Sequence, residues 1–510
     1  MGMGLLARFA SKCTALGSAA SLLFAMLACG SGSNSESNSG GTGGGSNNPP
    51  PLLQRLSTDT FSNPSSQHAT EVEPAVAAFG STLVAVFQMG RFFDGGASDI
   101  GFATSTDGGV TWQNGRLTGI TIFAGGTYSA VSDPAVAFDR AHGTWLIVSL
   151  AIVQTSTVVV SRSQDGMTWS GPVAVSNTPD ADKTWITCDN TQTSSFYGHC
   201  YVTWDDPSTD GLIWMSTSSD GGQTWRAANT GDSAKGIGGV PVVQPNGIVV
   251  VPASDDSGGH MIAFRSTDGG GSWSSSTIIA TISDHTVAGN LRNDALPMSA
   301  QDGNGMVYVV WPDCRFRSGC SSNDIVISKS SDGTAWTAPA RIPIDAVDST
   351  VDHFLPAIAA DPSTGGTSAH LALVYHYYPN TACTEITCQL NVAYVTSPDG
   401  EATWTAPGIL AGPMTLDWLA NTKLGRMVGD YVGVAYAPGK AFPAIAVARA
   451  NTGSTFDEAI YTTTAALTQA RAVVAVQHEQ PRPGARSDHP ARQFYDLEHR
   501  YPRRPPTAPK

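Results

Sequence analysis

Short runs of alternating apolar and small residues recur along the chain, each about the length of a β-strand. Residues 74–78 (PAVAA) and 134–138 (PAVAF) are two such runs, and a turn and a second apolar run follow each of them, as at residues 83–87 (LVAVF). A third run leads into a Gly-rich motif, and a fourth short run follows it, as at residues 172–175. Helical periodicity is weak in these segments. The pattern therefore predicts an all-β protein made of four-stranded units.

The Gly-rich motif occurs six times and has the form Ser-x-Asp-Gly, with a Trp three or four residues after the Gly. Its aspartates lie 48 to 67 residues apart, at Asp107, Asp165, Asp220, Asp268, Asp332 and Asp399. Glycine supplies the positive φ that a tight turn between two strands requires. We expect the Asp and Ser side chains to bond the amides of that turn. Six copies indicate a repeat architecture, and four strands per repeat are typical of the blades of a β-propeller.

A seventh unit lacks the motif and supplies only three apolar runs, at residues 430–436, 442–448 and 458–462. Its fourth strand is expected from the other end of the chain, at residues 52–56 (LLQRL). The sequence therefore predicts a single β-propeller over residues 52–466, closed by strands from both chain ends. Seven four-stranded blades are favoured, and six are the alternative.

The two ends of the chain differ in composition from the repeats. Residues 1–28 have the anatomy of an export signal, because two basic residues precede the apolar run 15–28. Cys29 follows this run as the cysteine of a bacterial lipobox does, and residues 29–51 form a Gly-, Ser- and Asn-rich tether. We expect a lipid on Cys29, with ordinary cleavage or a spare thiol as the alternative. The basic, Pro-rich residues 467–510 are expected to form a disordered tail.

These features predict an exported protein, held at the outer membrane or cell surface as a lipoprotein; a periplasmic or secreted protein is the alternative. Contact with the membrane is expected only through the lipid anchor. Six cysteines agree with an oxidising compartment, because they fall into close pairs that we expect to be the disulfides Cys188–Cys200, Cys314–Cys320 and Cys383–Cys388. A zinc site is the alternative, although the sequence contains no Cys-x-x-Cys motif.

The charge of the chain bears on its partners. The sequence has 28 basic and 42 acidic residues, of which eight and four follow from Arg471 onwards, which leaves 20 basic and 38 acidic residues before it. A protein that binds nucleic acid needs a basic face for the phosphates. We therefore expect no nucleic-acid partner.

The repeated motif resembles the Asp-box, or BNR, repeat of the sialidase (neuraminidase) superfamily, and the resemblance extends over about residues 53–466. It implies a β-propeller that acts on extracellular glycans as an exo-α-sialidase-type glycoside hydrolase. Enzymes of that superfamily use a Tyr nucleophile assisted by a Glu, an acid/base Asp, and three arginines that hold the substrate carboxylate. Arginine suits the last task because its planar guanidinium binds a carboxylate through two parallel hydrogen bonds.

Two segments resemble the site of that superfamily. Residues 429–433 (GDYVG) look like its Tyr-containing strand and place Tyr431 at the position of the nucleophile. Residues 90–94 (GRFFD) look like the segment that carries an arginine and the acid/base Asp, which makes Arg91 and Asp94 the candidates.

The chain also departs from the pattern of the superfamily at two places. The usual Phe-Arg-Ile-Pro is Glu-Val-Glu-Pro at residues 71–74, and small residues stand where the Glu of the middle blade is expected. The carboxylate that should assist Tyr431 would then be Glu73 or Asp430.

Propeller topology identifies candidates independently of the resemblance. The segment before the first strand of a blade and the loop after its second strand lie on one face, opposite the Asp-box turns. Acidic residues stand at the start of the first strands: Glu71, Glu73, Asp133, Asp182, Asp294, Asp352 and Asp430. Arginines stand after the second strands: Arg91, Arg315 and Arg449.

These two groups have competing interpretations. The three arginines could together bind a substrate carboxylate. Alternatively, each could form an ion pair with the aspartate eight or nine residues later, which is Asp99, Asp324 or Asp457. The acidic groups could hold a structural divalent cation such as Ca²⁺, act as acid/base pairs, bind a cationic ligand or remain solvated. We expect no cofactor to be required.

The leading prediction is a sialidase-like propeller that engages an extracellular glycan or glycoprotein, with exo-α-sialidase-type hydrolysis as its activity. Two alternatives remain open. One is a non-catalytic propeller that binds a glycan or a protein. The other is a different Asp-box glycosidase that works through a pair of carboxylates.

Replacing Cys29 tests the lipid anchor. Cys29→Ser should move the protein from the membrane pellet to the soluble fraction, because the acyl chains that would hold it there are lost. Cys13→Ser, inside the export signal, is the matched control and should leave the distribution unchanged. A Cys29→Ser protein that still sediments with membranes would show that no lipid is attached there.

Overall fold

The computed structural model describes residues 52–176, 180–231, 234–467 and 473–475. The predicted export signal and tether, with Cys29, and most of the predicted tail lie outside these residues. The described strands form antiparallel sheets in a β-propeller arrangement, so the predicted all-β class is confirmed. Within the described ranges, no helix is long and apolar enough to cross a membrane.

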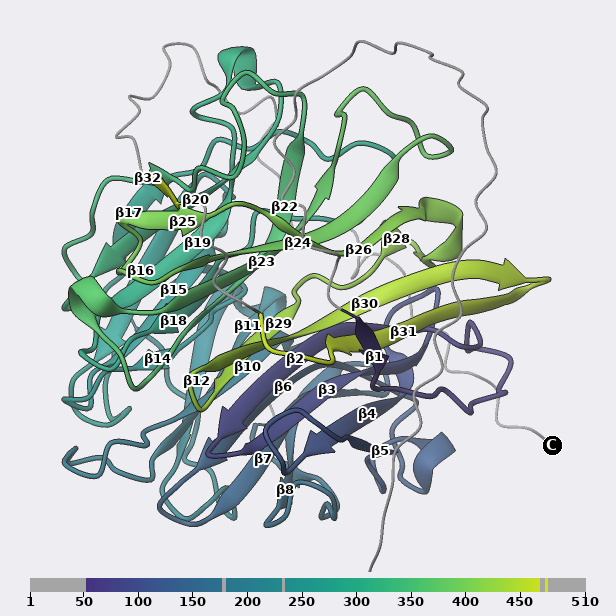
Figure 1. The fold of residues 1–510 in the computed structure, drawn as a ribbon. Helices are drawn as coiled ribbons and strands as arrows, with labels where there is room; N and C mark the ends of the chain where they lie inside the picture. The colour runs from purple at the N-terminus through teal and green to yellow at the C-terminus, as the bar shows by residue number, and fades with distance from the viewer. Residues whose placement is uncertain (1–51, 177–179, 232–233, 468–472, 476–510) are drawn as a thin grey trace, which may run out of the picture. The chain divides into compact units, whose positions relative to one another are not determined.

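The sheets follow one another along the chain (Figure 1). The first two units are joined into one eight-stranded sheet by the pair Ala97–Val131. Its first four strands are β2 (Glu71–Phe79), β3 (Thr82–Arg91), β4 (Ala97–Ser105) and β5 (Gln113–Arg116). The other four are β6 (Ala130–Asp139), β7 (Thr144–Ile152), β8 (Ser156–Ser163) and β9 (Val173–Ala174).

Four further sheets continue the series. The third unit contains β10 (Asp182–Cys188), β11 (Cys200–Asp206) and β12 (Leu212–Ser218). The fourth contains β13 (Gly236–Ile237), β14 (Val242–Val243), β15 (Val249–Asp255), β16 (His260–Ser266) and β17 (Thr277–Thr281). The fifth contains β18 (Met298–Gln301), β19 (Val307–Asp313), β20 (Asp324–Ser330) and β21 (Ala340–Arg341). The sixth contains β22 (Asp352–Ala360), β23 (Leu371–Tyr378), β24 (Gln389–Ser397) and β26 (Gly408–Thr415).

The last sheet contains strands from both ends of the described chain: β29 (Gly433–Ala437), β30 (Lys440–Thr452), β31 (Thr455–Thr463) and β1 (Leu53–Arg55). Leu53 pairs with Thr463, which confirms the strand expected at residues 52–56. Figure 1 shows the dark purple β1 beside the yellow β31. The innermost strands contact one another in the order β2, β6, β10, β14, β18, β22 and β29, and β29 contacts β2. The innermost strands therefore form a closed ring.

Smaller elements lie outside these sheets. Two short pairs are β25 (Thr403–Thr405) with β32 (Val473–Ala475), and β27 (Ala420–Thr422) with β28 (Gly425–Met427). Five 3-10 helices of three residues each are described: η1 (Ile122–Ala124), η2 (Pro207–Thr209), η3 (Ser318–Cys320), η4 (Gly366–Ser368) and η5 (Leu416–Trp418). Strand β32 belongs to the segment predicted as a disordered tail, so residues 473–475 of that segment are ordered against β25.

The six motif turns share one set of hydrogen bonds. In the first copy the Ser105 hydroxyl donates to Asp107 Oδ1 at 2.8 Å and accepts from the amide of Gly109 at 2.9 Å. Asp107 also accepts from the amide and the hydroxyl of Thr111. The same bonds from Ser to Asp and from the turn amides recur at the other five copies. The predicted role of the Asp and Ser side chains in the turn is confirmed.

These hydrogen bonds also set the charge of the turns. Bonds from the Thr111 hydroxyl and amide lower the pKa of Asp107 to about 2, and bonds from the amides of Thr168 and Met167 do the same for Asp165. A carboxyl whose pKa is lower in the folded state stabilises the fold above its unfolded pKa of about 3.9. That contribution is lost as the pH falls from about 4 to about 2.

Three disulfides hold loops of the described chain, and they are the predicted ones: Cys188–Cys200, Cys314–Cys320 and Cys383–Cys388. The first joins two residues that also pair across β10 and β11, so it fixes the ends of the segment between these strands. Residues 189–199 lie on the face that carries the motif turns, where His199 Nδ1 lies 3.3 Å from the carbonyl oxygen of Gly269 in the fourth motif.

Removing one turn carboxylate should destabilise the protein. Asp220 accepts from the amides of Gln223 and Thr224 at 3.0 Å each and from the Thr224 hydroxyl at 2.6 Å. We expect Asp220→Ala to reduce the free energy of unfolding by about 1–2 kcal/mol, measured by urea denaturation, because the turn loses these acceptors. Asp348→Ala, at an exposed aspartate outside the turns, should leave it nearly unchanged. Equal stability of the two variants would contradict a structural role for the turn.

Candidate functional site

β-Bulges bring charged residues to the centre of the ring. Glu73, Asp133 and Lys183 have positive φ values of 58°, 50° and 47°, and each lies at a register shift near the start of β2, β6 or β10. Leu355 occupies the same position in β22, with a φ of 46°. A bulge redirects a side chain, and positive φ is uncommon for residues other than glycine, so the surrounding structure must hold it. We call the group formed by Glu73, Asp133, Lys183, Arg292 and Asp430 the mouth cluster.

Asp430 is the most strongly paired member of the mouth cluster. Arg292 donates from Nε to Oδ1 at 2.6 Å and from Nη2 to Oδ2 at 2.5 Å, and Lys183 Nζ lies 2.7 Å from Oδ2. Burial alone would raise the pKa of this carboxyl, but Arg292 and Lys183 hold it well below its usual range. Asp430 is therefore a buried, ionised carboxylate with two cations on it.

Glu73 behaves in the opposite way. Burial, together with the nearby Asp133 and Asp430, raises its pKa to about 8. Its Oε2 accepts from Gln88, and its Oε1 accepts from the amide of Asp430 at 3.2 Å. Glu73 thus carries a proton at neutral pH, while a charged carboxylate lies beside it.

A chain of hydrogen bonds links Glu73 to Asp133. Gln88 Nε2 bonds both Glu73 and the Ser132 hydroxyl, which it meets at 3.1 Å, and Ser132 donates to Asp133 Oδ1 at 2.6 Å. The other oxygen of Asp133 accepts from the amide of Lys183 at 3.0 Å. The positions of the two acids are therefore coupled through Gln88 and Ser132.

Tyr431 lies next to the mouth cluster and is almost fully buried. Its hydroxyl donates to the carbonyl of Pro134 at 2.8 Å, and its ring meets Trp185 edge to face at 5.1 Å. Burial raises its pKa well above the usual value, and the nearby Glu73, Asp133 and Asp430 raise it further. In this geometry the hydroxyl points at a backbone carbonyl, and its surroundings disfavour the phenolate. The nucleophilic role of Tyr431 stays a prediction.

Arg91 is the one arginine of the predicted carboxylate clamp that reaches this region. It is buried, and its Nη1 donates to Gln88 at 2.8 Å. It lines a cavity of about 20 Å³ together with Asp133 and Arg292, and a second cavity of about 20 Å³ lies at Asp430 and Tyr431. Each cavity has room for about one water molecule. In this conformation the mouth cluster is therefore nearly closed to a sugar ring.

The other predicted residues lie apart from the mouth cluster. Asp94 is exposed and pairs with Lys423 at 2.8 Å. Arg315 pairs with Asp313 at 2.6 Å. Arg449 stacks over the ring of Tyr461 at 5.4 Å. The structure does not bring the three predicted arginines together, because Arg315 and Arg449 are each held by a neighbour of their own sheet.

The alternative pairing, of each arginine with the aspartate eight or nine residues later, is also wrong. Asp99 faces Arg116 at 3.9 Å, and Asp457 pairs with Arg55 at 3.0 Å. Asp324 pairs with Arg317 and Arg341, at 2.5 and 2.8 Å. Register alone does not explain this outcome, because Arg449 and Asp457 lie opposite each other in β30 and β31 and the Asp457 carboxylate nevertheless pairs with Arg55 of β1.

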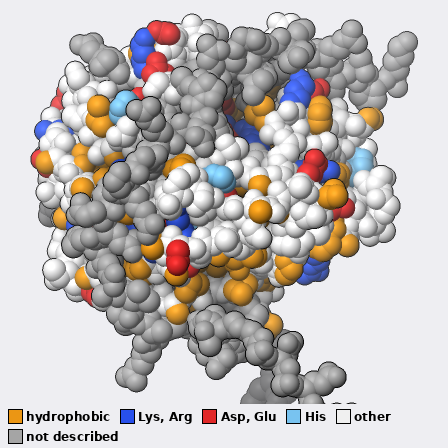
Figure 2. All heavy atoms as spheres, turned by 90° about the horizontal axis from the view of Figure 1, so that it is seen from above, with side chains coloured by type: hydrophobic (Ala, Val, Ile, Leu, Met, Phe, Trp, Pro, Cys, Tyr) orange, Lys and Arg blue, Asp and Glu red, His pale blue; other side chains and the backbone are white. Residues whose placement is uncertain are grey.

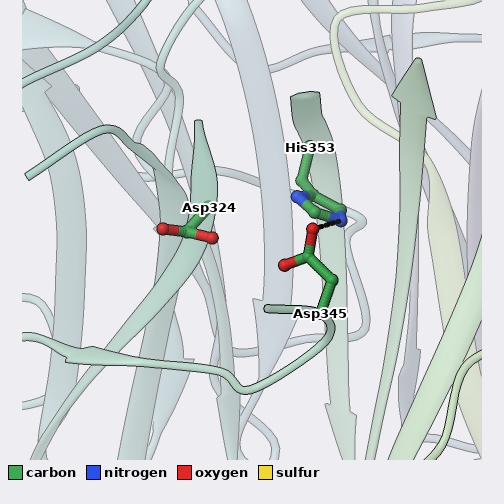
Figure 3. Close-up of side chains that lie close together, drawn as sticks. All are labelled: Asp324, Asp345 and His353. Atoms are coloured by element: carbon green, nitrogen blue, oxygen red, sulfur yellow. Dashed lines mark ion pairs between the residues drawn. The ribbon is translucent and has the colours of Figure 1, made fainter. Parts of the chain in front are cut away.

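One group of described residues has the side chains that a metal site would need: Asp324, Asp345 and His353 (Figure 3). However, Arg317 and Arg341 each contact both carboxylates at 2.5–2.8 Å. Burial lowers the pKa of His353, so its ring is neutral. Two guanidinium groups balance the two carboxylates, and the group forms an ion-pair network. The expected structural cation stays a prediction.

Charged side chains on the face seen in Figure 2 stand in small groups of mixed sign among uncharged residues. In the ion pairs Lys423–Asp94 and Lys329–Glu401, likewise, each lysine lies next to an acidic side chain. The described atoms on this face therefore form no broad basic area of the kind that binds nucleic acid.

Sequence reasoning missed Lys183 and Arg292. Lys183 occupies the bulge position that Glu73 and Asp133 occupy in their strands, but Thr184 follows it in place of the usual Pro. Alignment of the first strands would have found it. Arg292 comes from residues 282–297, an irregular segment between β17 and β18 held by backbone bonds to Arg426. No sequence signal marks it.

In comparisons with known proteins, no family model matches the chain, and no curated protein matches it. Similar solved structures include a Hadza microbial sialidase (14% identity, 73% of this chain and 75% of that chain, TM-score 0.42). They also include a Trypanosoma rangeli sialidase mutant displaying trans-sialidase activity, with 13% identity over 81% of this chain and 57% of that chain and a TM-score of 0.42. A third is a PL25 ulvan lyase, with 11% identity over 81% of this chain and 96% of that chain and a TM-score of 0.46. At these levels of similarity, function has to be argued from the residues of this chain.

Neutralising Asp430 should destabilise the protein strongly. Asp430→Asn would leave Lys183 and Arg292 buried without their shared carboxylate, and breaking a buried pair in this way costs about 3–5 kcal/mol. Urea denaturation should show a loss of that size. Asp94→Asn removes an ion pair with an exposed carboxylate and should cost less than about 1 kcal/mol. An unchanged midpoint for Asp430→Asn would mean that the mouth cluster does not contribute to stability.

Proposed function

We propose that the chain is an exported propeller that hydrolyses a glycosidic bond of an extracellular glycan with carboxylates of the mouth cluster, and not with Tyr431. One observation carries the proposal: Glu73, with a pKa of about 8, lies beside Asp430, whose pKa is lowered. A buried carboxyl group whose pKa is raised so that it keeps its proton at neutral pH is typical of a general acid.

The roles follow from the contacts of each group. Glu73 is protonated at neutral pH and would donate its proton to the oxygen of the leaving group. Asp133, held by Ser132 and by the amide of Lys183, would accept a proton from the attacking water. Asp430 would not react, because Arg292 and Lys183 already occupy both of its oxygens. Its charge would instead keep the proton on Glu73.

A second candidate function is a non-catalytic propeller that binds a glycan. The observation in its favour is the size of the two cavities at the mouth cluster, about 20 Å³ each. Catalysis would require part of the mouth cluster to move before a sugar ring reached Glu73, which is fully buried. A protein that bound a glycan elsewhere on its surface would need no such movement.

We also propose seven blades for the propeller. Five of the hydrogen-bonded sheets have four or more strands, but one of these contains two units, β2–β5 and β6–β9, joined by a single pair. The three-stranded sheet β10–β12 is a further unit in the ring. The closed series of seven innermost strands supports this count.

The catalytic proposal is tested with fluorogenic glycosides, a sialoside among them, assayed across a range of pH. Turnover should fall as the pH rises through about 8, because Glu73 must keep its proton to act as the acid. Glu73→Gln should reduce kcat by about 10²- to 10⁴-fold and abolish this pH dependence.

Glu71→Gln is the matched control. Glu71 lies in the same strand, is equally buried and has its pKa raised to about 8, but it faces Arg55 and not the mouth cluster. This variant should keep the wild-type activity, and its turnover should still fall as the pH rises through about 8. If Tyr431→Phe abolishes turnover of the sialoside while Glu73→Gln does not, the tyrosine mechanism is correct. Saturable glycan binding without turnover of any glycoside would establish the second candidate.

A further inference from the structure

A cavity of about 1010 Å³ opens on the face that carries the motif turns, at the opposite ends of the innermost strands from Glu73. The turns that follow these strands line it, among them residues 78–80, 190–193, 361–363 and 436–439. Small-molecule sites typically have volumes of about 300–1,000 Å³. The cavity therefore has room for a ligand larger than a single sugar ring.

The lining of the cavity combines apolar and polar surface and is almost uncharged. Amide and hydroxyl side chains dominate its polar part: Asn190, Gln192, Thr193, Gln301 and Ser363. The two charged lining residues, Arg140 and Asp361, have opposite signs. Phe79 and Tyr436 add aromatic surface, and Phe79 is 36% exposed.

The segment that carries Gln192 and Thr193 is held firmly in place. The Cys188–Cys200 disulfide closes it, Asp189 accepts from the amide of Thr191 at 3.0 Å, and the amide of Gly198 donates to the carbonyl of Asp189 at 2.9 Å. The Gln192 and Thr193 side chains themselves are exposed and form no hydrogen bond within the described chain. Because the backbone of this segment is already held, only the Gln192 and Thr193 side chains would have to become fixed when a ligand binds.

We propose that this cavity is a second ligand site, which binds an uncharged oligosaccharide. The hydroxyl groups of such a ligand both donate and accept, as the amides and hydroxyls of the lining do. A phosphorylated ligand would need several cations, and the lining offers only Arg140. An apolar ligand would cover the exposed Gln192 and Thr193 side chains without giving them hydrogen-bond partners. The site does not rest on the function proposed for the mouth cluster, because it lies on the opposite face and needs no catalytic group.

The site is tested by isothermal titration of the full chain with four neutral trisaccharides: maltotriose, cellotriose, xylotriose and chitotriose. We expect saturable binding of at least one of them. The double variant Gln192→Ala/Thr193→Ala should weaken that binding about tenfold or more, because two hydrogen-bonding side chains are lost. Its fold should be intact, since neither side chain bonds the rest of the described protein.

Two controls locate the binding. Gln113→Ala/Asn114→Ala changes two exposed polar residues of β5, outside the cavity, and should bind the trisaccharide as the wild type does. Glu73→Gln should also leave the affinity unchanged, whether or not the mouth cluster is catalytic. The proposal is wrong if none of the four sugars binds, if the Gln192/Thr193 variant keeps the wild-type affinity, or if Glu73→Gln abolishes the binding.

Discussion

The pairing of β1 with β31 is the constraint on which the rest of the structure depends. Without β1, the last sheet would lose its fourth strand, and the amino-terminal side of the chain would hydrogen-bond β31 mainly through the backbone carbonyls of His68 and Ala69. With it, Leu53 lies opposite Thr463, and β29 lies against β2. A closed ring brings the starts of the innermost strands to one small area. Charges that are far apart in the sequence, such as Glu73 and Asp430, meet there for that reason.

The mouth cluster shows what this crowding does to acids. Burial penalises every charge, so ionised groups persist only where a partner compensates them. Asp430 has two cations and stays ionised, whereas Glu73 has an amide and a backbone donor and keeps its proton. The pKa values of these two neighbouring carboxyl groups therefore differ because the two cations contact Asp430, whereas burial and the charges of Asp133 and Asp430 act on Glu73.

The repeats and the disulfides could be predicted from the sequence because they depend on local contacts. Asp107 bonds residues within four positions of itself, and Cys314 bonds Cys320 six positions away. Glu73 and Asp430 were predicted because propeller topology places the starts of first strands together. Arg315 lies apart from the mouth cluster, because Asp313, two residues away, binds its guanidinium. Arg292 was missed because an irregular segment delivers it, and such a segment leaves no periodic pattern in the sequence.

The β1–β31 pair also affects how the chain can fold. Residues 53–55 are synthesised early, but their partners at residues 461–463 are among the last residues of the described propeller to be made. Contacts between residues so distant in sequence form slowly, because a long loop must close first. The growing polypeptide must therefore carry an unpaired strand edge until synthesis is nearly complete. Such an edge can pair with other chains, so a chaperone that shields β1 or the β31 edge would protect this protein during its maturation.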